Sequence, residues 1–371
     1  MRDNPLLKLH ALGQSIWLDF INRELLRSGT LQRLIEADGL AGLTSNPAIF
    51  AKAIGQTGQY DEAIRARLGE RLDTKALYEA LALEDVQAAA DTFGPVYSAT
   101  RGRDGYVSLE VSPHLADDAA ATVEEARRLW AAFDRPNAMI KVPATRAGLE
   151  AIRTLIAEGI NVNVTLIFGV ARYREVVEAF LAGLEARAAA GGPIDGIASV
   201  ASFFLSRIDT LVDARLDAID SEEAHALRGQ AAIASARLAY QQYKQWTASE
   251  RWRRLAEQGA QPQRLLWAST STKDPRYSDI KYVEALIGPE TVNTVPPETL
   301  AAYRERGRPA LRLETDLLEA MALPAALERL GVSLDAASVE LEREGVRKFV
   351  EPFDELLGAL GERARLLQAR A

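Results

Sequence analysis

Short apolar runs rich in β-branched residues alternate with longer segments of helical periodicity, such as 117–133 and 172–190, along most of this 371-residue chain. Strands separated by helices indicate βαβ units and therefore a parallel sheet. Eight such units need about 250 residues, which suits a closed barrel better than an open sheet. We therefore predict an α/β fold, a (β/α)8 TIM barrel with additional N-terminal and C-terminal helices. The predicted strands are 15–20, 42–45, 105–111, 138–143, 161–168, 196–204, 264–270 and 291–295.

An open dinucleotide-binding sheet is the main alternative, and the sequence lacks the glycine patterns that it needs. Gly191 and Gly192 are adjacent, but no GxGxxG follows a predicted strand, and GxxxxGK[ST] is absent. Beyond Pro297 the chain is almost wholly helical, and no linker rich in Pro, Gly or Ser marks a boundary. We expect residues 1–371 to form a single domain, with about 297–371 as a helical C-terminal extension packed on the barrel.

The end of the chain has the pattern of an amphipathic helix. Leu341, Val346, Phe349, Phe353 and Leu357 can share one helical face. We expect this face to pack on the barrel. Its role stays open between covering the barrel, forming a subunit contact and closing over the substrate.

Composition and charge exclude several classes of function. The chain has no cysteine, which excludes disulfides and thiolate chemistry. His10, His114 and His225 are the only histidines and lack metal-ligand spacing, so we expect no metal site. A formal net charge of −8 argues against nucleic-acid binding. Because there is no long apolar run and the polar start MRDNPLLK is not typical of a secretory signal, we expect a cytoplasmic protein with no membrane partner.

Polar residues occur at strand positions that should face the inside of the barrel. One side of each strand packs against helices and the other fills the barrel. Ile140 and Val142 form the helix-facing side of their strand, so Lys141 points inward. Glu110 has the inward parity on the preceding strand, and Asp19 lies near the end of the first strand.

The fifth predicted strand repeats this pattern, with Asn161, Asn163 and Thr165 on one face. Taken singly, each polar residue has a structural alternative, since a strand lysine can be exposed, Asp19 can cap a helix and Glu110 can simply pair with the lysine. Lysine is, however, much rarer than arginine in this chain. A buried ammonium is costly and tends to lose its proton, and the neutral amine is the form that attacks a carbonyl. Active sites of such barrels lie at the strand carboxyl ends, so the combination indicates lysine-centred carbonyl chemistry.

At this point the sequence motifs themselves resemble those of transaldolases, in the family's order and over nearly the whole chain. The motifs are WLD at 17–19, TSNPAIF at 44–50, SLEV at 108–111, IKVPAT at 140–145, NVTLIF at 163–168 and SFFLSRID at 202–209. TSNP and IKVPAT are specific when both are present in this order. The length and the helical tail resemble the longer bacterial branch of the family.

The resemblance implies a metal-free transferase of the pentose phosphate pathway with no cofactor. It implies that Lys141 forms a Schiff base with C2 of sedoheptulose 7-phosphate or fructose 6-phosphate. Asp19 would then take the proton of the C4 hydroxyl, and Glu110 would shuttle protons through a water held by Thr165. The dihydroxyacetone unit would pass to glyceraldehyde 3-phosphate or erythrose 4-phosphate. The residues expected to line the substrate pocket are Asn46, Asn163, Ser202 and Phe204.

The expected phosphate contacts depart in part from the family pattern. Arg207 matches the family's phosphate arginine, whose fork suits a bidentate contact, although a surface arginine is the structural alternative. Many members have a second arginine in an Ala-Ser-x-Arg context, whereas this chain reads WASTSTK at 267–273. We expect Ser269 to retain its place, and Lys273 either to bind the phosphate as a point charge or to lie on the rim.

Two alternatives to a transaldolase stay open on sequence alone. A fructose-6-phosphate aldolase shares the lysine and the barrel, but those enzymes are shorter and typically carry Gln at the position of Glu110 and Tyr at that of Phe204. A non-catalytic barrel scaffold predicts the loss of Asp19, Glu110 or Lys141, and all three are present. Sugar phosphates are the expected partners, and the sequence does not decide between a monomer and a homodimer.

Overall fold

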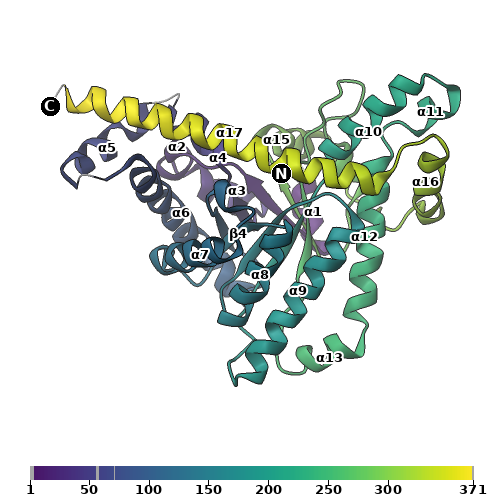
Figure 1. Ribbon diagram of the computed structural model, residues 1–371, viewed down its shortest axis with the longest axis horizontal. Coiled ribbons are helices and arrows are strands. Elements are labelled where there is room, and N and C mark those ends of the chain that lie inside the picture. The colour runs from purple at the N-terminus through teal and green to yellow at the C-terminus, as the bar shows by residue number, and fades with distance from the viewer. Residues whose placement is uncertain (1–3, 56–57, 71, 370–371) are drawn as a thin grey trace.

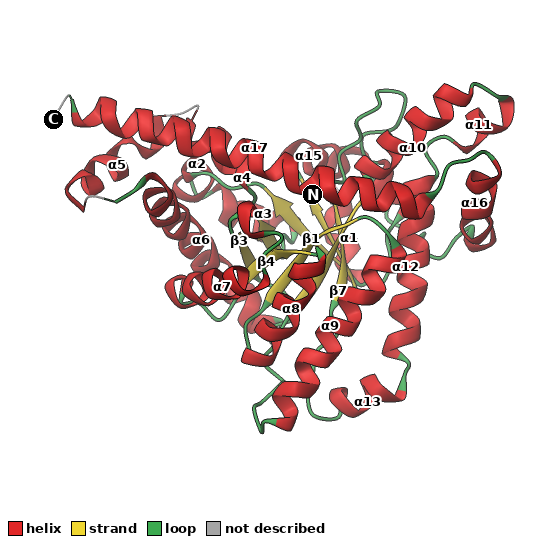
Figure 2. Ribbon diagram, in the orientation of Figure 1, coloured by secondary structure: helices red, strands yellow, loops and turns green. Residues whose placement is uncertain are grey.

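The computed structural model describes residues 4–55, 58–70 and 72–369, and its strands close into one parallel barrel in sequence order from β1 to β8 (Figures 1 and 2). The strands are β1 (Gln14–Asp19), β2 (Gly42–Thr44), β3 (Tyr106–Glu110), β4 (Ala138–Pro143), β5 (Val162–Ile167), β6 (Ser199–Phe204), β7 (Arg264–Ala268) and β8 (Thr291–Val295). The longer helices are α3 (Thr30–Asp38), α4 (Pro47–Gly55), α6 (Thr74–Ala99), α7 (Ala119–Phe133), α8 (Arg146–Glu158), α9 (Val170–Ala189), α10 (Ser206–Ile219), α12 (Ala231–Thr247), α15 (Pro297–Arg306), α16 (Leu317–Arg329) and α17 (Leu334–Gln368). The shorter ones are α1 (Pro5–Ala11), α2 (Arg23–Arg27), α5 (Asp61–Arg67), α11 (Glu222–Leu227), α13 (Glu250–Ala256), α14 (Lys281–Ala285) and the 3-10 turns η1 (Gly58–Tyr60), η2 (Leu68–Glu70) and η3 (Pro113–Leu115). The predicted (β/α)8 barrel is confirmed.

Strand boundaries differ from the predicted ones by a few residues, and positive φ angles accompany one early strand end and one register shift inside a strand. β7 ends at Ala268, two residues early, because Ser269 has a φ of 54° and turns the chain out of the sheet. In β5 the pairing with β6 shifts between Val164 and Ile167, where Leu166 has a φ of 60°. A positive φ costs energy for a residue with a side chain, so both positions are held by their surroundings.

A buried polar cluster closes the amino end of the barrel. The carboxylate of Asp104, on the turn before β3, accepts hydrogen bonds from Ser15 Oγ at 2.7 Å and from Trp17 Nε1 at 3.2 Å. The guanidinium of Arg264, at the start of β7, donates to Asp104 Oδ1 at 2.9 Å. Both charged side chains are at most 6% exposed. The cluster therefore ties β1, β3 and β7 together at the end of the barrel opposite the predicted site.

Helices outside the (β/α)8 pattern lie at both ends of the chain. α1 buries Leu6 and Leu9 and contacts β1 and α15. α15 follows β8 in the order of the barrel, so α16 and α17 are the helices beyond it. α17 has 35 residues and crosses the molecule as the long yellow helix of Figure 1, in contact with α4, α10 and β5. No helix of the described ranges has the length and apolarity that a membrane span requires.

The predicted apolar face of the tail is correct in its main residues and shifted in two. Leu341, Phe349 and Phe353 are buried, whereas Val346 and Leu357 are only partly buried against the core. Gly345 and Leu356 are buried as well. Through Phe353 the buried positions are four residues apart, so Gly345 is buried in place of Val346. Beyond Phe353, Leu356 is buried in place of Leu357.

Candidate active site

The register of the barrel places three polar side chains level with one another on adjacent strands. Glu110 pairs with Lys141 across β3 and β4, and Lys141 pairs with Asn163 across β4 and β5. Adjacent strands lie about 4.8 Å apart, so side chains of one register level and one face are neighbours. This is why residues far apart in the sequence meet at one point inside the barrel.

Lys141 is buried, with its side chain 6% exposed. Its Nζ lies 2.9 Å from the carbonyl oxygen of Ser45 and 3.2 Å from Glu110 Oε2, and donates to both. Burial raises the pKa of Glu110 above the ordinary carboxyl value, against the lowering effect of Lys141. A raised pKa makes Glu110 a stronger base than an exposed carboxylate, so it is equipped to exchange a proton with the amine.

Asp19 ends β1 and faces the same space. Thr44 Oγ1, on β2, donates a hydrogen bond of 2.7 Å to Asp19 Oδ1. Burial raises the pKa of Asp19, while the charge of Lys141 and the Thr44 hydrogen bond lower it. The two carboxylates near Lys141 therefore have different surroundings, since Glu110 contacts the amine directly and Asp19 is held by a hydroxyl.

A cavity of about 150 Å³ opens above Lys141 at the carboxyl ends of the strands. All but two of the residues predicted for the site line it. They are Asp19, Asn46, Lys141, Thr165, Ser202, Phe204, Arg207, Ser269 and Lys273. They lie in the carboxyl half of a strand, in the loop that follows it or, for Arg207, in the first turn of α10, which is the region expected for an active site in a (β/α)8 barrel.

The two remaining predicted residues lie behind the cavity wall. Glu110 is hydrogen-bonded to Lys141, and Asn163 is fully buried at the position that pairs with Lys141 on β5. Asn163 Nδ2 donates to Ser108 Oγ at 3.0 Å, and Ser202 Oγ donates to Asn163 Oδ1 at 2.7 Å. Asn163 thus orients Ser202, which does reach the cavity.

Two polar groups of the cavity keep hydrogen-bonding capacity for a ligand. Asn46 precedes α4, and its Oδ1 accepts from the backbone N–H of Ile49 at 3.0 Å, which leaves the amide donors to the cavity. Thr165 Oγ1 is buried without a hydrogen-bond partner among the described residues. Buried polar groups are normally paired, so such a hydroxyl at a cavity indicates a site for a polar ligand.

Arg207 and Lys273 add positive charge to the cavity. Burial lowers the pKa of both side chains, and the charge of Arg207 lowers that of Lys273 further, against the raising effect of Glu298. Nη1 of Arg207 is buried and has no hydrogen-bond partner in the described part of the chain. In a chain of net charge −8, these local cations with Lys141 make the cavity suitable for an anionic group.

The loop that carries Lys273 is tied to α10, the helix that carries Arg207. Tyr277 Oη donates to Asp213 Oδ2 at 2.5 Å, and Lys281 Nζ donates to Asp209 Oδ2 at 2.7 Å. Within the loop, Lys273 Nζ donates to Ser271 Oγ at 2.6 Å. Arg207 and Lys273, the two residues expected to contact a phosphate, therefore lie on segments that hydrogen bonds hold together.

Several cavity residues were not predicted from the sequence. Thr44 and Thr294 share a hydrogen bond of 2.8 Å on the inner side of β2 and β8, and Phe349 reaches the cavity from α17. The inward parity of Thr44 within the TSNP motif was an available signal. Asn161, in contrast, has the inward parity but lies away from the cavity, where its amide donates to the Ala138 carbonyl at 3.0 Å.

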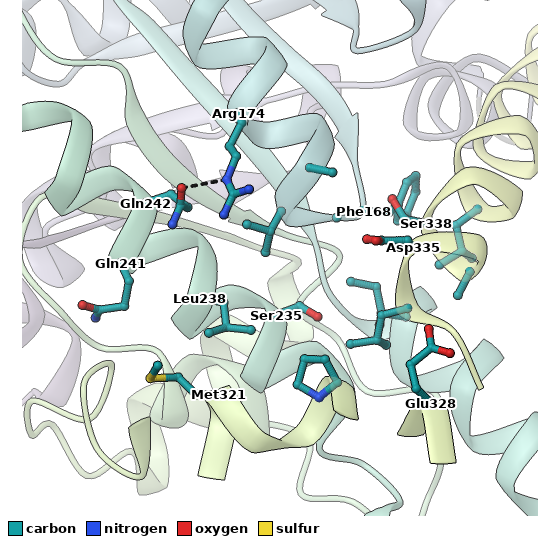
Figure 3. A pocket seen from close by; sticks show the side chains of 18 of the residues that line it. Phe168, Arg174, Ser235, Leu238, Gln241, Gln242, Met321, Glu328, Asp335 and Ser338 are labelled. Carbon is teal, nitrogen blue, oxygen red and sulfur yellow. Dashed lines mark hydrogen bonds between the residues drawn. The ribbon is translucent and has the colours of Figure 1, made fainter. Parts of the chain in front are cut away.

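A larger cavity of about 490 Å³ lies outside the barrel wall, between α9, α12, α16 and α17 (Figure 3). Ser235, Leu238 and Met321 face it, and Arg174 donates a hydrogen bond to Gln242 at its edge. Phe168 lines this cavity, and its ring centroid lies 5.3 Å from that of Phe204, which lines the inner one, with the two rings tilted by 53°. The two cavities are therefore separated by an aromatic pair, and Lys141 belongs to the inner one.

A buried lysine paired with a carboxylate at the carboxyl end of a (β/α)8 barrel, with a second carboxylate nearby, is typical of enzymes that form a Schiff base with a carbonyl substrate. Comparison with known proteins defines the family. The sequence model of the Transaldolase/Fructose-6-phosphate aldolase family matches residues 16–360.

Curated relatives are similar over nearly their full lengths. The chain is 48% identical to Transaldolase 2 of Nostoc sp. (strain PCC 7120), over 99% of each protein. It is 48% identical to a transaldolase of Thiobacillus denitrificans, over 94% of this chain and 98% of that protein, and 49% identical to one of Thermobifida fusca, over 97% and 98%. The chain belongs to the transaldolase family. The predicted family and its transferase class are confirmed.

Proposed function

We propose that this chain transfers a dihydroxyacetone unit from a ketose phosphate to an aldose phosphate, with Lys141 as the covalent residue and Asp19, Glu110 and Thr165 as the proton-transfer groups. The single observation that carries the proposal is the buried Lys141 Nζ, 3.2 Å from Glu110 Oε2 and in one cavity with Asp19. The family membership supports the reaction, and the cavity geometry supports the roles of the residues.

Schiff-base formation begins when Lys141 gives up a proton and its neutral amine attacks C2 of fructose 6-phosphate or sedoheptulose 7-phosphate. Glu110 is the acceptor of that proton, since it already receives a hydrogen bond from Nζ and its pKa is raised by burial. The carbinolamine then loses its C2 hydroxyl as water, protonated from the Glu110 side through a water held by Thr165. An iminium that links C2 to Nζ remains.

Carbon–carbon cleavage uses the second carboxylate. Asp19 takes the proton of the C4 hydroxyl, the C3–C4 bond breaks, and its electron pair moves into the iminium to give an enamine. The aldose phosphate leaves, and an acceptor such as erythrose 4-phosphate or glyceraldehyde 3-phosphate enters. Asp19 then returns the proton as the new C3–C4 bond forms, and water releases the product from Lys141.

The substrate would be recognised at two places, its three-carbon unit at the floor of the cavity and its phosphate at the mouth. Asn46 and Ser202, the latter oriented by Asn163, are placed to hold the hydroxyls of the three-carbon unit. Phe204 supplies an apolar wall that protects the enamine from water. At the mouth, the phosphate would lie between the recognition residues Arg207, Ser269 and Lys273.

The helical tail belongs to the same functional unit in this proposal. We take residues 1–371 as a single domain, with about 297–371 as a helical extension, because α17 contacts β5, α4 and α10 and contributes Phe349 to the cavity. Sugar phosphates are the partners that this site suits.

Trapping of the covalent intermediate tests the proposal. The enzyme is incubated with fructose 6-phosphate, reduced with borohydride and mapped by mass spectrometry, with Lys141→Met as the matched control. We expect the three-carbon adduct on Lys141 and none on the control. Beyond the one equivalent that forms the adduct, fructose 6-phosphate should be consumed only when erythrose 4-phosphate is present. An adduct on another lysine, or none, would show that the assignment is wrong, and acceptor-independent release of dihydroxyacetone would indicate an aldolase.

A further inference from the structure

Arg207 lies close to two aromatic rings that come from different parts of the fold. Its Cζ is 5.7 Å from the ring centroid of Phe204, at the end of β6, and 5.8 Å from that of Phe349, on α17. Both rings are largely buried, at 8% and 7% exposure. A guanidinium within about 6 Å of an aromatic ring is attracted to its face, and more strongly where water is excluded.

Hydrogen bonds do not explain the position of this arginine. Nη1 of Arg207 is buried and unpartnered among the residues that the structure describes. A guanidinium whose neighbours are aromatic rings and not carboxylates keeps N–H donors for another acceptor, because a ring offers no carboxylate oxygen to occupy them. The same donors would be occupied if a carboxylate held the side chain.

We infer that Phe349 is a positioning residue for phosphate recognition: it completes an aromatic clamp on Arg207 and so directs the guanidinium edge toward the substrate phosphate. The inference rests on the proposed role of Arg207. It gives α17 a defined part in specificity, since the helix supplies one half of the clamp. The ring centroid of Phe349 also lies 5.9 Å from Lys141 Nζ, so the same ring borders the phosphate end and the reacting end of the cavity.

α17 is anchored independently of the clamp, so that its position does not depend on the arginine. One helical turn further on, Phe353 packs edge-on against Tyr78 at 5.5 Å and against His114 at 6.0 Å. Phe353 is 3% exposed and does not line the cavity above Lys141. It therefore offers a matched control on the same helix.

The test compares acceptors with and without a phosphate. In a ping-pong reaction, kcat/KM for the acceptor reports only the half-reaction that follows enamine formation, so effects on the donor cancel. With sedoheptulose 7-phosphate as the common donor, the measured quantity is the ratio of kcat/KM for glyceraldehyde 3-phosphate to that for D-glyceraldehyde. We call this ratio the phosphate preference.

We expect Phe349→Leu to lower the phosphate preference about fivefold, because it keeps apolar bulk and loses the ring face. Phe349→Tyr should retain the preference, and Phe349→Met, a second non-aromatic replacement, should lower it as Leu does. Phe353→Leu should reduce Tm and leave the preference unchanged. Arg207→Met should lower it about 100-fold, which reports on the arginine itself.

Two results overturn the inference in distinguishable ways. If Arg207→Met lowers the phosphate preference and neither Phe349→Leu nor Phe349→Met does, the clamp is wrong while the proposed function stands. The same holds if the Phe349 variants slow both acceptors equally. If Arg207→Met itself leaves the preference unchanged, the phosphate role of Arg207 is wrong and the clamp fails with it.

Discussion

Replacement of Lys141 by Met removes the amine and keeps an unbranched apolar side chain that is one atom shorter, so it leaves Glu110 buried without its partner. At the observed 3.2 Å, two unit charges attract by about 5 kcal/mol at an effective dielectric of 20. Glu110 can avoid this loss by taking up a proton. From the ordinary carboxyl pKa of 4.5, that uptake costs about 5 kcal/mol at pH 8 and less than about 1 kcal/mol at pH 5.

The expected loss of stability therefore depends on pH. Burial already raises the pKa of Glu110, and loss of the Lys141 charge raises it further. A carboxyl with a raised folded-state pKa stabilises the fold below its unfolded pKa and loses that contribution as the pH rises through the folded one. Lys141→Met should thus lower the free energy of unfolding by about 3–5 kcal/mol at pH 8 and by about 1 kcal/mol or less at pH 5.

Urea unfolding of the wild type, Lys141→Met, Glu110→Gln and the double variant at both pH values measures this effect. The double variant should regain most of the stability that Lys141→Met loses at pH 8, because no buried charge remains. A loss of equal size at both pH values would contradict the reasoning. So would single-variant losses that simply add, since either result means that the two side chains are not a charged pair in the folded protein.

Three further predictions concern the base, its hydroxyl partner and the opposite end of the barrel. Asp19→Asn should lower kcat for transfer about 1,000-fold while borohydride still traps the uncleaved ketose phosphate on Lys141, and loss of that adduct would place Asp19 in an earlier step. Thr44→Val removes a hydrogen bond that lowers the pKa of Asp19, so that pKa should rise and the acidic limb of the kcat–pH profile should move to higher pH; an unmoved limb would contradict the role of Asp19 as base. Arg264→Met should lower the free energy of unfolding by about 3 kcal/mol without changing kcat/KM, and the double variant Arg264→Met/Asp104→Asn should regain most of the lost stability. An effect confined to activity would refute a purely structural role for Arg264.

The barrel and the core of the site could be predicted because both depend on strand parity. A lysine between Ile140 and Val142 can face only inward, and the register then fixes its neighbours. Glu110 and Asn163 follow from the same alternation. Parity does not, however, indicate how far along the strand a residue lies. Asn161 has the inward parity of Asn163 but lies at the amino end of the strand, where its amide donates a hydrogen bond to the Ala138 carbonyl.

Contacts between distant elements were beyond the reach of the sequence pattern. Phe349 has the same apolar spacing as Phe353, and nothing in that spacing separates the ring that meets Arg207 from the one that packs on Tyr78. The position of α17 over the barrel decides this. Likewise, a serine with a φ of 54° carries no local signal, so the early end of β7 could not be anticipated.

Closure of the barrel between its first and last strands has a consequence for the synthesis of the chain. β1 pairs with β2 on one edge, but its other edge pairs with Thr291–Val295 of β8. Until those residues leave the ribosome, the backbone groups of Gln14–Leu18 that face β8 form an open strand edge, which can recruit other chains. The nascent protein therefore carries an aggregation-prone edge through most of its translation, and the first strand is completed almost last.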